Sequence, residues 1–170
     1  MAQRENNVFT HADSIDQVDT YSSVQSFTPQ VNYDLVLVKL KMARKGSPGI
    51  TTVEIHTADG SDIPTGASLA TETFNGNDLT TNLNNPEIKT ITYISPASLG
   101  SGTKYAIQVI PTNFEGNVTY VAWYDDNLAT AYANGRGMER PNGTTWVARN
   151  SDFYFDTYDL RSVIPKVCIF

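Results

Sequence analysis

The sequence predicts an all-β fold, an antiparallel two-sheet sandwich. Short runs of alternating apolar and polar residues recur along the chain, separated by stretches rich in Gly, Pro, Asn and Asp, and no helical periodicity is sustained. The clearest signal is an antiparallel pair within 99–125, whose first strand ends at Pro111 because proline cannot donate to a ladder. Alternate residues of this pair share a predicted core-facing side: Tyr105, Ile107, Val109, Val121 and Trp123.

The other strands follow from the same alternation. In 35–42, one face carries Val36, Val38, Leu40 and Met42, and the other carries Lys39 and Lys41, which we expect to point to water. Turn residues at 46–49 are expected to end this strand. In chain order, strands are predicted at 24–28, 35–42, 51–57, 68–74, 88–94, 103–110, 117–125, 145–148 and 153–158. Their irregular spacing, with long loops at 58–66 and 125–142, favours a jelly roll over an up-and-down barrel.

The 170 residues predict one domain with two unusual ends. We expect an N-terminal arm at 1–22, a sandwich at 23–158 and an apolar C-terminal tail at 159–170. The arm is either disordered or extended along a neighbouring subunit, and the tail either returns as a final strand or docks on another chain. Four apolar residues are the candidate attachment residues: Phe9, Ile15, Ile169 and Phe170.

Composition argues against several classes of partner. A net charge of -6 and a pI near 4.7 disfavour nucleic acid, because phosphate binding requires a concentrated positive surface. The one cysteine, Cys168, excludes an intrachain disulfide. We expect no membrane insertion, because no apolar run is long enough to span a bilayer. No signal-peptide core is present, so synthesis in the cytoplasm of the producing cell is expected.

Catalysis is not expected from these residues. The only histidines are His11 in the arm and His56 on the outward side of a strand, too few for a nucleophile and base arrangement. Acidic residues are abundant at 59–62 and 125–127, and a second acidic group follows at Asp152, but such side chains usually cap turns in all-β proteins. We expect no cofactor; a structural Ca²⁺ at one of these loops is the alternative, although neither has EF-hand spacing.

Three tyrosines are candidates for a sugar-binding surface. Tyr120 and Tyr124 fall on the strand face opposite Val121 and Trp123, and Tyr132 lies in the adjoining loop. A flat ring stacks on the apolar face of a pyranose at little entropic cost. The other interpretation is that these rings cover the sandwich or contact a partner subunit.

An ordered series of segments resembles a known module. It comprises Gln25–Thr28, Tyr33–Leu40, Arg44–Gly49, Asp59–Gly60, Pro64–Gly66, Leu69–Ala70, Leu99–Ile107, Trp123, Trp146 and Asp152–Phe155. Together they are similar to the jelly-roll module of phage structural proteins and of bacterial "choice-of-anchor" surface proteins. The resemblance implies a non-catalytic β-sandwich used for display or adhesion, sometimes described as carbohydrate-binding-like.

Two functional hypotheses follow. The first is a virion structural protein, a capsid decoration or a tail- or fibre-associated subunit, attached through its termini to capsid or tail proteins. We expect it to reside in the virion and to form a homo-oligomer, a trimer by analogy with other jelly-roll virion proteins. The alternative is an adhesion module that recognises a surface glycan through Tyr120, Tyr124 and Tyr132.

Overall fold

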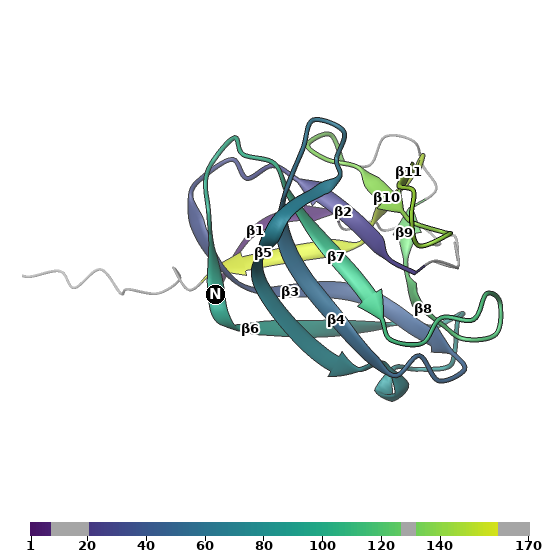
Figure 1. Ribbon diagram of the computed structural model, residues 1–170. Coiled ribbons are helices and arrows are strands. Elements are labelled where there is room, and N and C mark those ends of the chain that lie inside the picture. The colour runs from purple at the N-terminus through teal and green to yellow at the C-terminus, as the bar shows by residue number, and fades with distance from the viewer. Residues whose placement is uncertain (8–20, 127–131, 160–170) are drawn as a thin grey trace, which may run out of the picture.

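The computed structural model describes residues 1–7, 21–126 and 132–159, which form two antiparallel sheets packed face to face (Figure 1). The five-stranded sheet contains β1 (Ala2–Asn7), β13 (Phe155–Asp159), β3 (Tyr33–Lys45), β6 (Glu87–Leu99) and β8 (Tyr120–Trp123). The first four lie side by side in this order, and β8 pairs with the end of β3.

The six-stranded sheet forms the opposite layer. In spatial order it contains β11 (Val147–Ala148), β10 (Gly137–Glu139), β2 (Ser23–Phe27), β7 (Tyr105–Pro111), β4 (Ile50–Ala58) and β5 (Pro64–Asn75). A two-stranded sheet joins β9 (Asp125–Asp126) to β12 (Asp152–Phe153), and a 3-10 helix, η1 (Gly76–Asp78), follows β5. Among the residues that the structure describes, no helix is long and apolar enough to cross a membrane.

The strand order confirms the predicted sandwich and gives it a jelly-roll topology. One sheet runs β1-β13-β3-β6 and the other contains β2-β7-β4-β5. If β13 is counted as the eighth strand, these orders are 1-8-3-6 and 2-7-4-5, the pattern produced when a long hairpin of eight strands rolls into two sheets. The short strands β8 to β12 are an insert between the seventh and eighth strands.

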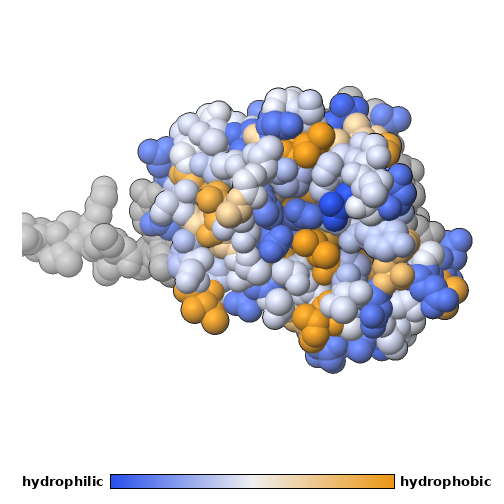
Figure 2. Space-filling view, viewed as in Figure 1, coloured by the Kyte–Doolittle hydropathy of each residue, from blue (hydrophilic) through white to orange (hydrophobic). Residues whose placement is uncertain are grey.

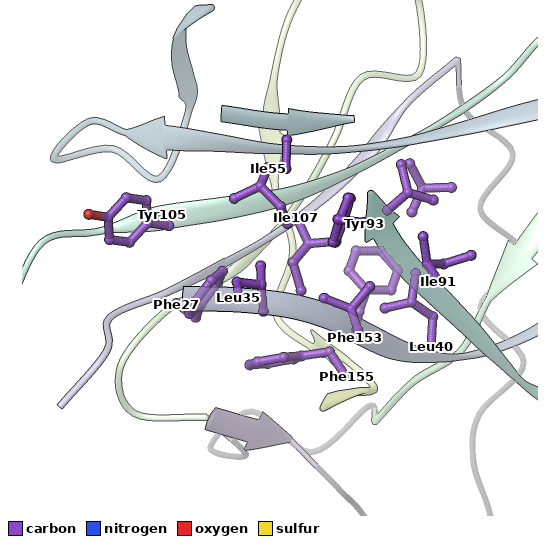
Figure 3. Packing of buried hydrophobic residues seen from close by; sticks show 14 of the residues in the cluster. Phe27, Leu35, Leu40, Ile55, Ile91, Tyr93, Tyr105, Ile107, Phe153 and Phe155 are labelled. Atoms are coloured by element: carbon purple, nitrogen blue, oxygen red, sulfur yellow. The ribbon is translucent and has the colours of Figure 1, made fainter. Parts of the chain in front are cut away.

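The core fills the space between the two sheets. Ile55 and Ile107 point inward from the six-stranded sheet and meet Leu35, Leu40 and Phe155 from the other layer (Figure 3). Alternation therefore predicted the core side correctly, and all five expected core residues of 99–125 belong to this cluster. One strand departs from simple alternation: β3 has an irregular register between Leu35 and Leu37, which brings Leu35 into the core instead of Val36.

A turn that begins at Gly46 joins β3 to β4. Gly46 has φ 63°, and a Cβ at this position would lie 2.5 Å from Thr119 Oγ1 and 2.6 Å from the Val118 carbonyl oxygen. Both the backbone conformation and the close approach require glycine. Residues 46–49 thus form the turn that the sequence predicts, with positive φ at both Gly46 and Gly49.

The structure corrects the extent of the N-terminal arm. Residues 2–7, assigned to the arm from sequence, form β1 and pair antiparallel with β13. Their sequence shows no apolar alternation, so nothing local marked them as a strand. The rest of the predicted arm (8–20) and the tail beyond Asp159 (160–170) lie outside the described residues, as do Phe9, Ile15, Ile169 and Phe170.

Candidate functional site

Tyr120 and Tyr124 occupy the predicted face but are not exposed. They point away from the main core, opposite Trp123, yet their residues are only 0% and 2% exposed. Leu83 and Phe114, from two loops, pack over them, and the Tyr124 hydroxyl donates to the Leu83 carbonyl oxygen. The expectation of an exposed stacking surface is therefore wrong for these two rings, because the loops that carry Leu83 and Phe114 cover that end of the sheet.

Tyr132 is also a structural residue. Its ring packs edge-on against Phe155, with centroids 5.1 Å apart, and it is 9% exposed. The hydroxyl donates to Glu5 Oε2 at 3.3 Å, and burial together with this carboxylate raises the tyrosine pKa well above its ordinary value. Tyr132 thus joins the insert to β1 and offers no open ring face to a sugar.

The acidic loop 59–62 serves turn formation. Asp59 Oδ1 accepts from the backbone amides of Ser61 (2.8 Å) and Ile63 (3.0 Å), and Asp62 Oδ1 lies 2.7 Å from both Ser26 Oγ and Lys104 Nζ. These oxygens are therefore used by the protein itself. Within the described residues, no three His, Cys, Asp or Glu side chains gather in a way that could hold a metal ion.

The second acidic cluster lies at the β9–β12 pair. Asp125 Oδ2 accepts from Arg149 Nη2 at 2.8 Å, and Arg149 Nη1 donates to Glu139 at 2.6 Å. Asp126 is the register partner of Asp152, and burial, with smaller contributions from Asp152 and Asp125, raises the Asp126 pKa to about 6. Burial also raises the pKa of Asp152.

This cluster borders a polar hollow of about 440 Å³. Arg136, Asn150 and Asp152 are among its lining residues, but Arg136 Nε donates to the Arg149 carbonyl oxygen and Asp152 accepts from Gln25 at 2.9 Å. The polar side chains of Arg136 and Asp152 therefore form hydrogen bonds within the protein. His56, the histidine within the sheet, lies 3.1 Å from Glu54 Oε2, a contact between side chains on one strand face.

A partly exposed aromatic face lies on the outside of the five-stranded sheet. Tyr154 and Tyr158 alternate with core-facing Phe153, Phe155 and Thr157, so both rings point outward. Lys39 Nζ lies 4.9 Å from the Tyr158 ring centroid and Lys41 Nζ 6.0 Å from that of Tyr154. We call this set the tyrosine–lysine face: Lys39, Lys41, Tyr154, Asp156 and Tyr158.

Sequence reasoning missed the tyrosine–lysine face, although a signal was present. The alternation within 153–158 places Tyr154 and Tyr158 on the side opposite two phenylalanines, the same pattern that was used for Tyr120 and Tyr124. Figure 2 shows the opposite side of the molecule, over β4, β5 and β7, where apolar residues appear as separate spots among hydrophilic ones.

The two predicted attachment segments follow residues at opposite ends of one strand pair. In the β1–β13 register, Asn7 faces Phe155 and Ala2 faces Asp159. The segment after Asn7 and the segment after Asp159 therefore begin roughly 15 Å apart along the strands. Comparison with protein-family models and with curated proteins found no match to this chain, so its function is inferred from fold and surface alone.

Proposed function

We propose that this protein is a non-enzymatic structural subunit of a virion, a capsid decoration or a tail- or fibre-associated protein. The observation that carries the proposal is the strand order 1-8-3-6 and 2-7-4-5, an architecture used by viral capsid and lectin domains. This is an argument by analogy of fold. Such a subunit assembles with its own copies and with capsid or tail proteins.

Attachment is assigned to the segment between β1 and β2 and to the segment that follows β13. Phe9 and Ile15 precede the first strand of the six-stranded sheet, and Ile169 and Phe170 end the sequence. Burying each such side chain against a partner contributes about 1.5–3 kcal/mol, so a few anchors offset the entropy lost on association. A rigid sandwich with apolar flanking residues is a suitable body for such a subunit.

The test is incorporation into particles. A Phe9→Ser and Ile15→Ser double variant keeps β1 intact, whereas deletion of the whole arm would remove a strand of the sheet. We expect this variant, and an Ile169→Ser and Phe170→Ser variant, to fold but to be lost from purified particles. Val31→Ser, which alters an exposed apolar residue of the sandwich, is the control. Normal incorporation of both double variants would contradict attachment through the ends, and absence of the wild-type chain from particles would contradict the virion role.

The tyrosine–lysine face favours glycan recognition as a second candidate function. Its two rings are partly exposed, unlike those of the buried Tyr120, Tyr124 and Tyr132, and its ammonium groups can donate to sugar hydroxyls. A glycan array should then show binding by the wild-type chain and loss of binding in a Tyr154→Ala and Tyr158→Ala variant. Tyr21→Ala, an exposed tyrosine outside this face, should bind normally. A folded wild-type protein that binds no glycan would rule this candidate out.

A further inference from the structure

β1 is an edge strand built entirely without large apolar side chains. Its sequence is Ala-Gln-Arg-Glu-Asn-Asn, and it forms the outer edge of the five-stranded sheet, paired only with β13 in the sheet order. The stability of most strands comes from the apolar surface that they bury, at about 25 cal/mol per Å². The side chains of β1 contribute little of this, so the free energy that holds β1 in place is small compared with that of a core strand.

The position of β1 is nevertheless specified by several directed polar contacts. Arg4 donates through Nε (3.0 Å) and Nη2 (2.9 Å) to Asp159 Oδ2, whose side chain is fully buried. Gln3 Nε2 donates to Asp156 Oδ1 at 2.8 Å, and the Glu5 amide donates to Thr157 Oγ1 at 2.9 Å.

Glu5 connects this strand to the rest of the molecule. Its Oε1 accepts from the Gln30 backbone amide at 3.0 Å and its Oε2 accepts from the Tyr132 hydroxyl. When β1 leaves, the buried carboxylate of Asp159 loses Arg4, and Gln30 and Tyr132 lose Glu5. Only a strand that supplies the same groups in the same order restores these contacts, so the vacated edge selects such a strand.

A second copy of this chain supplies such a strand. Thirteen residues, 8–20, connect Asn7 to Tyr21, and a chain of this length can span up to about 45 Å, more than the width of a small domain. An identical β1 from a neighbouring copy reproduces every contact with Asp159, Asp156, Thr157, Gln30 and Tyr132. Exchange of an identical element between protomers adds no new interface that must evolve separately.

We propose that β1 exchanges between copies of this protein, so that β1 of one subunit pairs with β13 of the next. This inference rests on the proposed function in one respect, since it explains how subunits of an assembled particle are linked. The interaction surface is the β13 edge, and its occupant is residues 2–7 of a second copy. The weak apolar contribution of β1 permits release, and the Arg4 and Glu5 contacts make the rebinding specific.

Cysteine cross-linking tests the exchange directly. Gln3 and Tyr158 are register partners in the β1–β13 pair, so a Gln3→Cys and Tyr158→Cys variant, made with Cys168→Ser, forms a disulfide across this pair. We expect disulfide-linked dimers and larger species on non-reducing gels, in a fraction that rises with protein concentration during refolding. Lys39→Cys with Thr90→Cys, register partners in the β3–β6 pair, is the matched control and should yield only intramolecular links.

A second measurement does not depend on these variants. The wild-type chain, refolded at high concentration under reducing conditions, should contain dimers or larger oligomers by light scattering. Intramolecular links alone at every concentration, with a monomeric wild-type chain, would overturn the exchange. If there is no exchange but the wild-type chain still enters particles, the proposed function stands without exchange. If exchange occurs and no particle contains the chain, the proposed function is contradicted and exchange stands.

Discussion

The apolar body of the sandwich and the polar seam between β1 and β13 are stabilised in different ways. In the body, the Trp123 indole stacks on Phe153 with centroids 4.4 Å apart, and both residues are essentially inaccessible to solvent. In the seam, Arg4 binds Asp159 and Glu5 binds Tyr132, with no large apolar side chain from β1. Apolar burial is non-directional and supplies most of the free energy of folding, whereas polar contacts are directional and specify a partner. A sandwich stabilised by its apolar body can therefore keep its fold while β1 is replaced by the same strand of another copy.

The largest expected effect is in the body. Trp123→Ala removes a buried ring and the hydrogen bond from Nε1 to the Tyr154 carbonyl oxygen, so we expect a loss of about 3–5 kcal/mol in the free energy of unfolding. Urea unfolding measures it. Trp146→Ala, which removes a half-buried ring on the outer side of the six-stranded sheet, should cost clearly less. Equal losses would show that the body is not organised around the space between the sheets.

An intermediate effect is expected in the seam. Arg4→Ala leaves the buried Asp159 carboxylate without this partner, a change that costs about 3–5 kcal/mol in a rigid interior. Because β1 is an edge strand that can detach, the loss should stop at about 1–2 kcal/mol, the expected free energy of detachment. Urea unfolding of Arg4→Ala beside Lys104→Ala, whose partner Asp62 is less buried, checks this. A loss as large as that of Trp123→Ala would mean that β1 is an integral part of the body.

The pH dependence of stability should distinguish the polar β9–β12 region from the apolar body. Burial raises the folded-state pKa of Asp126 to about 6 from an ordinary 3.8, so its contribution to stability is fully present below pH 3.8 and is lost as pH rises through 6. Asp126→Asn cannot ionise. The difference between the thermal midpoint of Asp126→Asn and that of wild type should therefore shift in favour of the variant as the pH is raised from 5 to 8. A constant difference across this range would contradict the raised pKa.

The smallest effect is expected on the tyrosine–lysine face. Lys39→Ala removes a partly exposed ammonium group from the ring of Tyr158, and we expect a change within about 0.5 kcal/mol in urea unfolding. The face is then available for recognition without a role in folding. A loss above about 2 kcal/mol would place Lys39 with the structural residues of the sandwich.

Alternation predicted much of the fold because it is a local property. It gave the core side of β7 and β8, with Ile107 and Trp123 inside. The Gly and Pro residues of 46–49 predicted the turn there, which is also a local property. Alternation also predicted correctly that Tyr120 and Tyr124 point away from the main core, but not that both side chains are buried. The loops that cover these rings carry Leu83 and Phe114, and their positions depend on the tertiary fold.

β1 could not have been predicted by the same reasoning. Its residues have no period, and the partners that hold them are far away in sequence: Arg4 and Asp159 are 155 positions apart. A strand fixed by polar groups at the other end of the chain leaves no local pattern. The tyrosine–lysine face is different, because the alternation around Phe155 already places Tyr154 and Tyr158 on the outer side of the sheet.

Native-state hydrogen exchange tests the separation between body and seam most directly. The amide of Glu5 in β1 and the amides of the central strands β4 and β7 are compared in one wild-type sample under native conditions. We predict that β1 amides exchange through a local opening of about 1–2 kcal/mol, while β4 and β7 amides exchange only through global unfolding. Equal protection of β1 and β7 would contradict a replaceable β1 and, with it, the exchange of this strand between copies.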